Sequence, residues 1–211
     1  TMNLSNRLRA RRAWGLGGLA LAAALVCPSA PALAQGFPNK PIRLVVANPP
    51  GGLTDTIARM LAPRLQEALG QPIVIDNKPG ANGGVAAATL AQSAADGYSF
   101  LVADGSVLSV NPLAAKSLAY DPKHLVPVSL VARAPLFLAV NTKTPIHSLD
   151  ELVALAKTQP GKLNYGSSGI GSTHHLTMEA LKAEYGIFIT HIPFRGSAAS
   201  VPAMLGGQVE M

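Results

Sequence analysis

The sequence predicts an α/β fold built on parallel strands. Short, nearly continuous apolar runs recur along the chain, and segments with apolar residues at helical spacing lie between them. Turns rich in glycine, proline or serine separate the runs from the helical segments. Strands covered by helices on both faces have this apolar composition, and strand–helix–strand units of this kind form parallel sheets with right-handed crossovers.

The first such unit is expected between residues 42 and 70. Residues 42–47 form an apolar run after a proline-rich entry, and residues 48–52 break it. From Thr54 onward, apolar residues recur at helical spacing, and Gly70 ends the segment. The pattern then repeats, with a strand expected at 73–75, a loop at 78–84, a helix at 85–95 and a strand at 99–103.

The middle of the chain has a different pattern. Prolines at 112, 122 and 127 interrupt it, and apolar runs follow at 128–131 and 136–140. We therefore expect the chain to cross between two domains near residues 103–121. This places domain 1 at 35–103 and domain 2 at 104–211.

Residues 148–211 again alternate between helical and strand patterns. Ser148 with Glu151 three residues later is a capping-box pattern, and the helix that it begins is expected to end near Thr158. The elements expected next are a strand at 164–166, a glycine-serine loop at 167–172, a helix at 173–185, a strand at 187–192 and a short helix ending at 205. Residues 209–211 begin like a strand, so domain 2 is expected to be incomplete at the C-terminus.

Residues 1–34 have the pattern of a cleavable secretory signal peptide. Four arginines without an acidic residue precede an apolar run at 14–26, and small residues lead to an expected cleavage site near Ala34. The run is shorter than the ~20 apolar residues that cross a bilayer. Arg11-Arg12 leaves a twin-arginine signal open beside the general secretory route. We expect the mature chain to be periplasmic.

The charge balance argues against a nucleic-acid-binding protein. The chain has 17 basic and 11 acidic residues, a formal net charge of +6. Four of the basic residues lie in the expected signal, so the mature chain carries 13 minus 11, or +2. The single cysteine, Cys27, lies there too, which excludes an internal disulfide and a cysteine-based metal site in the mature chain.

Three turns are the candidate ligand site. They lie at 49–55, 80–84 and 166–173, each between an expected strand and an expected helix. Unpaired backbone amides and the positive end of the helix dipole make such turns suitable for a carboxylate or phosphate. In an open parallel sheet these turns share one edge, where ligands bind. The plainer alternative is that glycine only permits tight turns.

Enzyme signatures are mostly absent. The glycine-serine loop lacks the nucleophile-elbow spacing, and no dinucleotide or phosphate-loop fingerprint is complete. Adjacent His174 and His175 point about 100° apart on a helix, which is unsuited to a shared metal ion. An exported serine hydrolase using Ser167 or Ser168 with one of these histidines stays an alternative, although no orienting acid is evident nearby.

The chain also resembles a known family through motifs that occur in order along it. These are KPIR at 40–43, PGG at 50–52, NKPGANGG at 77–84, DGY at 96–98, NP at 111–112, YDP at 120–122, YGSSGIGS at 165–172, HL at 175–176 and PFRGS at 193–197. The family is the Bug family, the periplasmic solute receptors of tripartite tricarboxylate transporters. The resemblance implies a periplasmic-binding-protein-like fold with two hinged domains that close on a ligand.

The same resemblance implies a function and a set of binding residues. The expected role is a monomeric, non-enzymatic receptor that captures a small organic carboxylate and delivers it to a membrane permease, without cofactor or metal. A sensor with the same fold stays an alternative. The expected ligand-binding residues are Gly51, Gly52, Thr54 and Asp55 on one side, Ser167, Ser168, Gly171 and Ser172 on the other, and Arg195 or Ser197 at the distal end of the ligand.

Three features depart from the family pattern. Ala47-Asn48 stands where a proline followed by an aromatic residue is common, so an aromatic wall is missing. Asn82 replaces a usual glycine or alanine. Family members also continue well beyond residue 211.

Overall fold

The computed structural model describes residues 36–211, of which residues 38–211 form one compact unit. The expected signal peptide at 1–34 lies outside the described residues. Within the described part of the chain, no helix is long and apolar enough to cross a membrane.

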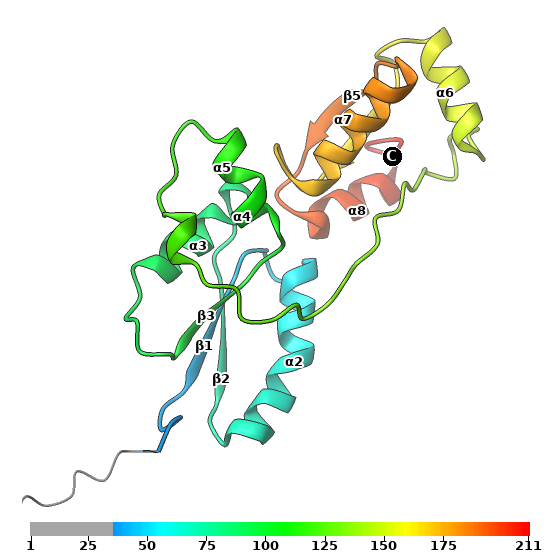
Figure 1. Ribbon diagram of the computed structural model, residues 1–211. Helices are drawn as coiled ribbons and strands as arrows, with labels where there is room; N and C mark the ends of the chain where they lie inside the picture. The colour runs from blue at the N-terminus through cyan, green and yellow to red at the C-terminus, as the bar shows by residue number, and fades with distance from the viewer. Residues whose placement is uncertain (1–35) are drawn as a thin grey trace, which may run out of the picture. The chain divides into compact units, whose positions relative to one another are not determined.

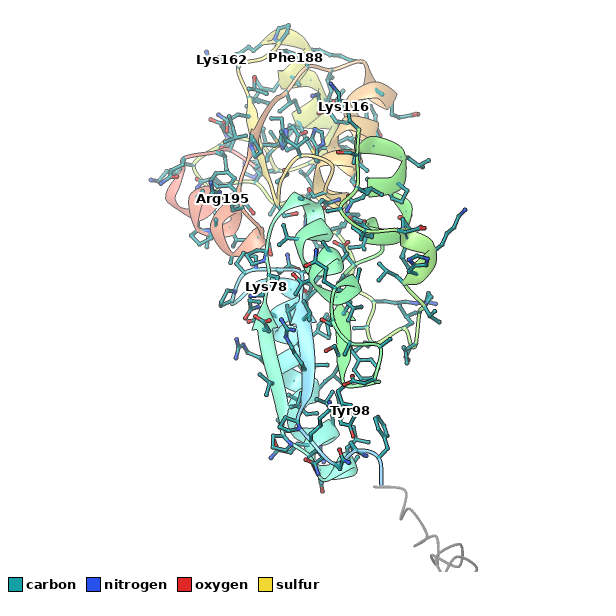
Figure 2. The ribbon with its side chains drawn as sticks, turned by 90° about the vertical axis from the view of Figure 1, so that its left-hand side faces the viewer. Lys78, Tyr98, Lys116, Lys162, Phe188 and Arg195 are labelled. Carbon is teal, nitrogen blue, oxygen red and sulfur yellow. The ribbon has the colours of Figure 1, made fainter. Side chains whose placement is uncertain are left out.

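The first half of this unit is built around a three-stranded parallel sheet (Figure 1). Strands β1 (Ile42–Val46), β2 (Ile73–Asn77) and β3 (Ser99–Val102) lie in the order β2-β1-β3. Lys78, which follows β2, and Tyr98, which precedes β3, lie at opposite ends of the sheet (Figure 2). The structure confirms the predicted parallel strands.

Helices cover both faces of this sheet. Helix α2 (Leu53–Leu69) packs on one face against Leu44, Val46, Phe100 and Val102. The alternate residue Leu101 packs on the other face, where Ala87 of helix α3 (Gly84–Ala91) is fully buried. This two-sided burial explains why the strands have continuous apolar runs.

Short helical turns extend the second layer. They are η1 (Ala81–Gly83), α4 (Ser106–Ser109), α5 (Asn111–Ala114) and η2 (Pro122–His124). Val107 and Tyr120 pack in one cluster with Ala87, and the Tyr120 hydroxyl donates to the Val107 carbonyl oxygen at 2.6 Å. Residues 104–125 therefore share a core with the first sheet. The domain boundary at 103/104 stays a prediction.

Residues 126–140 connect this part to the second sheet without forming a helix or a strand. The apolar runs at 128–131 and 136–140 are largely exposed, and Phe137 has 84% of its surface accessible.

The second sheet is a parallel pair. Strands β4 (Asn164–Ser167) and β5 (Thr190–Pro193) pair in register, and helices α6 (Leu149–Thr158), α7 (Thr173–Tyr185) and α8 (Ser197–Gly206) accompany them. Leu152, Tyr165, Met178 and Ile189 belong to the core of this half. The Ser148 hydroxyl accepts a hydrogen bond from the Glu151 amide at 3.2 Å, so the predicted cap is confirmed.

The main differences from the prediction are at the start of β5, at the end of α3 and at residues 209–211, and the other element ends differ by at most two residues. Strand β5 begins at Thr190 and not at 187, because the Ile187 amide bonds to the Lys182 carbonyl and closes the end of α7. Helix α3 ends at Ala91 and not at 95, since the Ser93 amide and hydroxyl bond to carbonyls of the last turn. Residues 209–211 form no assigned strand, although the Gly166 amide donates to the Met211 carbonyl at 2.7 Å.

Candidate functional site

The loops that follow all five strands meet around one cavity of about 760 Å³. Its wall comprises residues 47–49 after β1, 79–83 after β2, Asp104 after β3, 168–170 after β4, and 193–196 at the end of β5 and after it. All these loops leave the carboxyl ends of parallel strands, which is where ligands bind in open α/β sheets.

Asp55 fixes the turn after β1 and is not part of the cavity wall. Its side chain accepts hydrogen bonds from the Gly51 amide at 2.8 Å, Arg59 Nε at 2.9 Å and Asn77 Nδ2 at 2.9 Å. Arg59, Asn77 and the Gly51 amide outweigh the cost of burial and lower the Asp55 pKa to about 2. The carboxylate is 1% exposed, so it organises the turn and does not face the cavity.

The other residues predicted in this turn do not line the cavity either. Gly51, Gly52 and Thr54 are absent from its wall, where Ala47, Asn48 and Pro49 stand instead. The Thr54 hydroxyl donates to Asn48 Oδ1 at 2.5 Å. Thr54 thereby orients an amide that lies on the cavity.

Asn82 connects the loop after β2 with the loop after β4. Its φ of 51° is left-handed, a conformation that asparagine tolerates better than most residues. The side-chain Nδ2 donates to Asn111 Oδ1 at 3.0 Å and to the Gly171 carbonyl oxygen at 2.9 Å. Asn82, which replaces the glycine or alanine usual in the family, therefore links two loops at the wall of the cavity.

The glycine-serine loop places only one of its predicted residues on the cavity wall. Ser168 lines the cavity, and its hydroxyl lies 2.9 Å from His174 Nδ1. Ser167 is 1% exposed and its hydroxyl lies 2.6 Å from His191 Nε2. Ser172 caps α7 by accepting from the His175 amide at 3.3 Å.

Two charged residues of opposite sign line the cavity. Arg195, in the loop that leads into α8 (Figure 2), has no ion pair or side-chain hydrogen bond within residues 36–211. Asp104 accepts a hydrogen bond from the Ser106 amide at 2.9 Å, and no cation pairs with it among the described residues. Ser197 begins α8 and is not part of the wall.

The contact between Ser168 and His174 does not complete a hydrolase triad. Burial lowers the His174 pKa, and the nearby Asp104 charge opposes this only in part. No hydrogen bond joins Asp104 to His174 in the described residues, so no acid fixes the tautomer of the ring. Nor do the described residues contain a group of three or more histidine, cysteine or acidic side chains placed to hold a metal ion.

A second hollow of about 1230 Å³ lies beside the extended segment 126–140 and helices α7 and α8. Its wall is mainly apolar, with Phe137, Leu181 and Val201 among its residues. The loops after β1, β2 and β3 do not reach it. The smaller cavity at the strand ends is therefore the candidate ligand site.

Parallel strands whose carboxyl ends surround a cavity lined by a few polar and charged side chains define a class of α/β proteins that bind small ligands. The particular family follows from comparison with known proteins. The family model described as tripartite tricarboxylate transporter family receptor, TctC, matches residues 57–211. The chain belongs to this family.

Curated relatives agree with this assignment. A UPF0065 protein of Bordetella pertussis is 42% identical over 188 residues, covering 89% of this chain and 58% of the relative. Protein BugT of the same organism is 42% identical over 183 residues, covering 86% of this chain and 56% of BugT. The chain thus spans less than two thirds of the length of these relatives.

Solved structures show the same fold. Rpa4515 of R. palustris, solved with adipate, has a TM-score of 0.80 and 38% identity over 83% of this chain and 59% of its own. MatC of Rhodopseudomonas palustris, with bound malate, has a TM-score of 0.75 and 31% identity over 82% of this chain and 60% of its own. The periplasmic binding protein BugD has a TM-score of 0.67 and 29% identity over 82% of this chain and 58% of its own. The predicted fold class, α/β of the periplasmic-binding-protein type, is confirmed.

Sequence reasoning did not select Asn48, Asn82 or Asp104 as site residues, although all three line the cavity. Each lies in the loop that follows a predicted strand, and this position could have marked it as a candidate site residue. Of the residues that it did select, Ser168 and Arg195 line the cavity. The binding roles of all the selected residues stay predictions.

Proposed function

We propose that this chain is a solute-binding receptor that captures a small organic carboxylate in the cavity at the strand ends. The observation that carries the proposal is Arg195, a cavity-lining cation with no ion pair within the described residues. A carboxylate ligand would supply that partner through a charge-assisted hydrogen bond. The relatives solved with adipate and with malate are carboxylate complexes.

The backbone around the cavity supports the same ligand class. Helices α2, α3, α7 and α8 begin directly after the loops that line it. The amino ends of helices carry partial positive charge and unpaired amides, so several of them near one cavity favour an anion. The Ser168 hydroxyl adds a neutral donor, which suits reversible binding.

The wider role follows from the family. We propose that the mature, exported chain acts in the periplasm as a monomer and delivers its ligand to the membrane permease of a tripartite tricarboxylate transporter. Residues 35–103 and 104–211 would belong to two hinged domains whose closure traps the ligand. A sensor using the same binding step would differ only in its partner.

A binding experiment with the described chain tests this proposal. Adipate and malate should raise the melting temperature in a thermal-shift assay and release or absorb heat in isothermal titration, because ligand binds the native state alone. Adipamide, the uncharged analogue of adipate, is the matched control and should have no effect. A folded chain that responds to no carboxylate, or equally to adipamide, would contradict the proposal.

The alternative of an exported hydrolase is tested separately. We propose that the chain is not an enzyme, because the contact between Ser168 and His174 has no orienting acid among the described residues. The chain should therefore not hydrolyse p-nitrophenyl esters above the background rate. Hydrolysis that disappears in Ser168→Ala would favour the hydrolase.

A further inference from the structure

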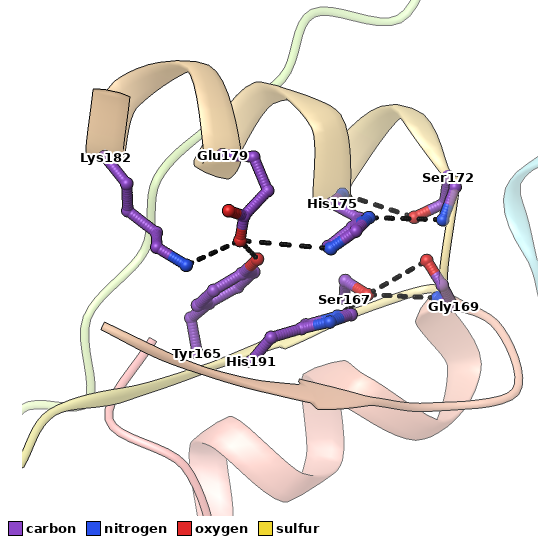
Figure 3. Close-up of polar contacts among 9 residues, drawn as sticks. Tyr165, Ser167, Gly169, Ser172, His175, Glu179, Lys182 and His191 are labelled. Carbon is purple, nitrogen blue, oxygen red and sulfur yellow. Dashed lines mark hydrogen bonds and ion pairs between the residues drawn. The ribbon is translucent and has the colours of Figure 1, made fainter. Parts of the chain in front are cut away.

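Three stacked rings lie beside the turn between β4 and α7 (Figure 3). The ring centroids of His175 and His191 are 4.1 Å apart with an interplanar angle of 22°. Tyr165 also stacks on His191, at 4.8 Å and 21°. The stack therefore joins α7 to both strands of the second sheet.

His175 accepts a hydrogen bond from the backbone of this turn. The Gly171 amide donates to His175 Nδ1 at 3.2 Å, so Nδ1 carries a lone pair and no proton. The ring proton is then on Nε2, which faces Glu179 Oε1 at 3.9 Å. The observed geometry requires the neutral form of His175.

Gly171 also connects this ring to the cavity. Its carbonyl oxygen accepts the hydrogen bond from Asn82 Nδ2 at 2.9 Å, and Asn82 lines the cavity. The two polar groups of Gly171 thus bind His175 on one side and Asn82 on the other. A change at the imidazole can reach the cavity wall through a single residue.

Different charged groups face His175 and His191. Glu179 accepts from the Tyr165 hydroxyl at 2.8 Å and from Lys182 Nζ at 2.6 Å, and it is the carboxylate that faces His175. Burial lowers the pKa of His191, His175 and Lys182 lower it further, and Glu179 only partly opposes them. The contact of His191 with the Ser167 hydroxyl can also reverse donor and acceptor, so it does not depend on one protonation state.

We propose that His175 is a positioning residue for the ligand-binding turn: its neutral ring holds the Gly171 amide, and protonation of that ring releases the turn and weakens ligand binding. Protonation makes both ring nitrogens donors, so Nδ1 then opposes the Gly171 N–H instead of accepting it. Affinity is therefore higher while the His175 ring is neutral and falls when the ring is protonated. This inference rests on the proposed carboxylate-binding function.

A ligand-free measurement tests the positioning step alone. The Gly171 amide resonance of the full chain, followed by ¹H–¹⁵N NMR from pH 8 to pH 5.5, should shift with the same midpoint as the His175 ring protons. In His175→Asn the amide resonance should be independent of pH, because the asparagine carbonyl oxygen is an acceptor that does not titrate. A Gly171 resonance that does not follow the His175 ring would overturn the proposal, whatever the ligand.

Calorimetric titration with adipate tests the consequence for binding. Loss of one hydrogen bond corresponds to a change of about tenfold, so the dissociation constant should rise about tenfold between pH 8 and pH 5.5. His175→Asn should bind adipate within about threefold of the unmodified chain at pH 8. Its dissociation constant should rise less toward pH 5.5, and the rise that remains comes from the titration of adipate itself, which affects both proteins. His175→Leu, which offers no acceptor, should bind about tenfold more weakly at both pH values.

The neighbouring histidine is the matched control. His174→Asn should keep the pH dependence of the unmodified chain, because His174 bonds to Ser168 and not to Gly171. An unchanged pH dependence in His175→Asn would overturn the proposal. If the Gly171 resonance titrates but adipate and malate do not bind, the positioning step stands and the proposed function fails instead.

Discussion

Asn82 Nδ2 donates a hydrogen bond to the carbonyl oxygen of Gly171 at 2.9 Å, although 89 residues separate the two in the chain. Because Nδ2 also donates to Asn111, both protons of this amide are used. The side chain therefore fixes the loop after β2 against the loop after β4 at the cavity wall.

Replacing Asn82 with glycine should weaken carboxylate binding without disturbing the backbone. Glycine adopts the φ of 51° at no steric cost, so only the side-chain hydrogen bonds are removed. We expect the dissociation constant for adipate to rise about tenfold, as for one or two lost hydrogen bonds. Isothermal titration measures the dissociation constant. Asn82→Ala adds backbone strain at the left-handed φ, so it should also lower the melting temperature. Unchanged affinity in Asn82→Gly would show that the link is dispensable for binding.

Arg195 should provide most of the electrostatic attraction for the ligand. Charge-assisted hydrogen bonds contribute about 1.5–3 kcal/mol, so Arg195→Gln should weaken adipate binding by about tenfold to a hundredfold. The loss should be smaller at 1 M salt than at 0.05 M, because screening already weakens the pair. Arg64→Gln is the control, since Arg64 is 84% exposed on α2 and is not part of the cavity wall. Equal effects of the two substitutions would argue against a direct contact.

Asp104 should oppose ligands that carry only negative charge. Its carboxylate lines the cavity without a cationic partner among the described residues, so Asp104→Asn removes a repulsion and keeps an acceptor for the Ser106 amide. We expect tighter binding of adipate, by about threefold to tenfold. Calorimetry compares adipate, which carries only negative charge, with glutamate, which also carries a positive amino group. The comparison shows whether Asp104 repels the first ligand and attracts the second. Weaker adipate binding in this variant would mean that Asp104 contacts the ligand favourably.

Asp55 should stabilise the fold and not select the ligand. Removal of its charge in Asp55→Asn leaves three donors without a carboxylate, and we expect a loss of about 2–3 kcal/mol in the free energy of unfolding. Urea unfolding at pH 7 measures the loss, and Glu67→Gln, on the exposed part of α2, is the control.

The effect of Asp55 should depend on pH with a definite sign. Its pKa is lowered to about 2 from the usual 3.8, so its contribution is complete above the unfolded value and is lost as pH falls toward 2. The difference between Asp55→Asn and the unmodified chain should therefore shrink between pH 4 and pH 2. A constant difference over that range would contradict the role of the charge.

Gly83 should not tolerate a side chain. Its φ is 83°, and a Cβ there would lie 2.8 Å from Val107 Cγ2 and 3.3 Å from Ala47 Cβ. Gly83→Ala combines left-handed strain with overpacking, and we expect a destabilisation of about 2 kcal/mol or more. Gly206→Ala is the control, because nothing lies within 4 Å of its added Cβ. Chemical denaturation of both variants compares them directly.

Local signals predicted the elements of this chain well. Helix α7 has the predicted bounds because Ser172 caps its first turn and Gly186 ends it in a left-handed conformation, and both signals lie within the segment. The parallel direction of β1, β2 and β3 was predicted from their apolar composition and the intervening helices, whereas their order in the sheet was not. The predicted start of β5 was wrong, because the Ile187 amide bonds to the Lys182 carbonyl and closes the end of α7, a local bond that apolar periodicity does not reveal.

The candidate site was predictable only as a set of turns. The sequence identified the loops after β1, β2 and β4, but not which side chains face the cavity. Asp55 turns inward because Asn77, 22 residues away, offers it a hydrogen bond. Asn82 depends on Gly171 in the same way. Such partners are set by how the strands are ordered, so residue spacing alone could not assign them.

Ile170 lies on the wall of the cavity with 74% of its surface exposed, and residues 36–211 contain no cysteine. Ile170→Cys would therefore give a single attachment point for an environment-sensitive fluorophore beside the ligand. The label would report occupancy of the cavity as a change in emission, and the chain would become an optical sensor for the proposed carboxylate ligand.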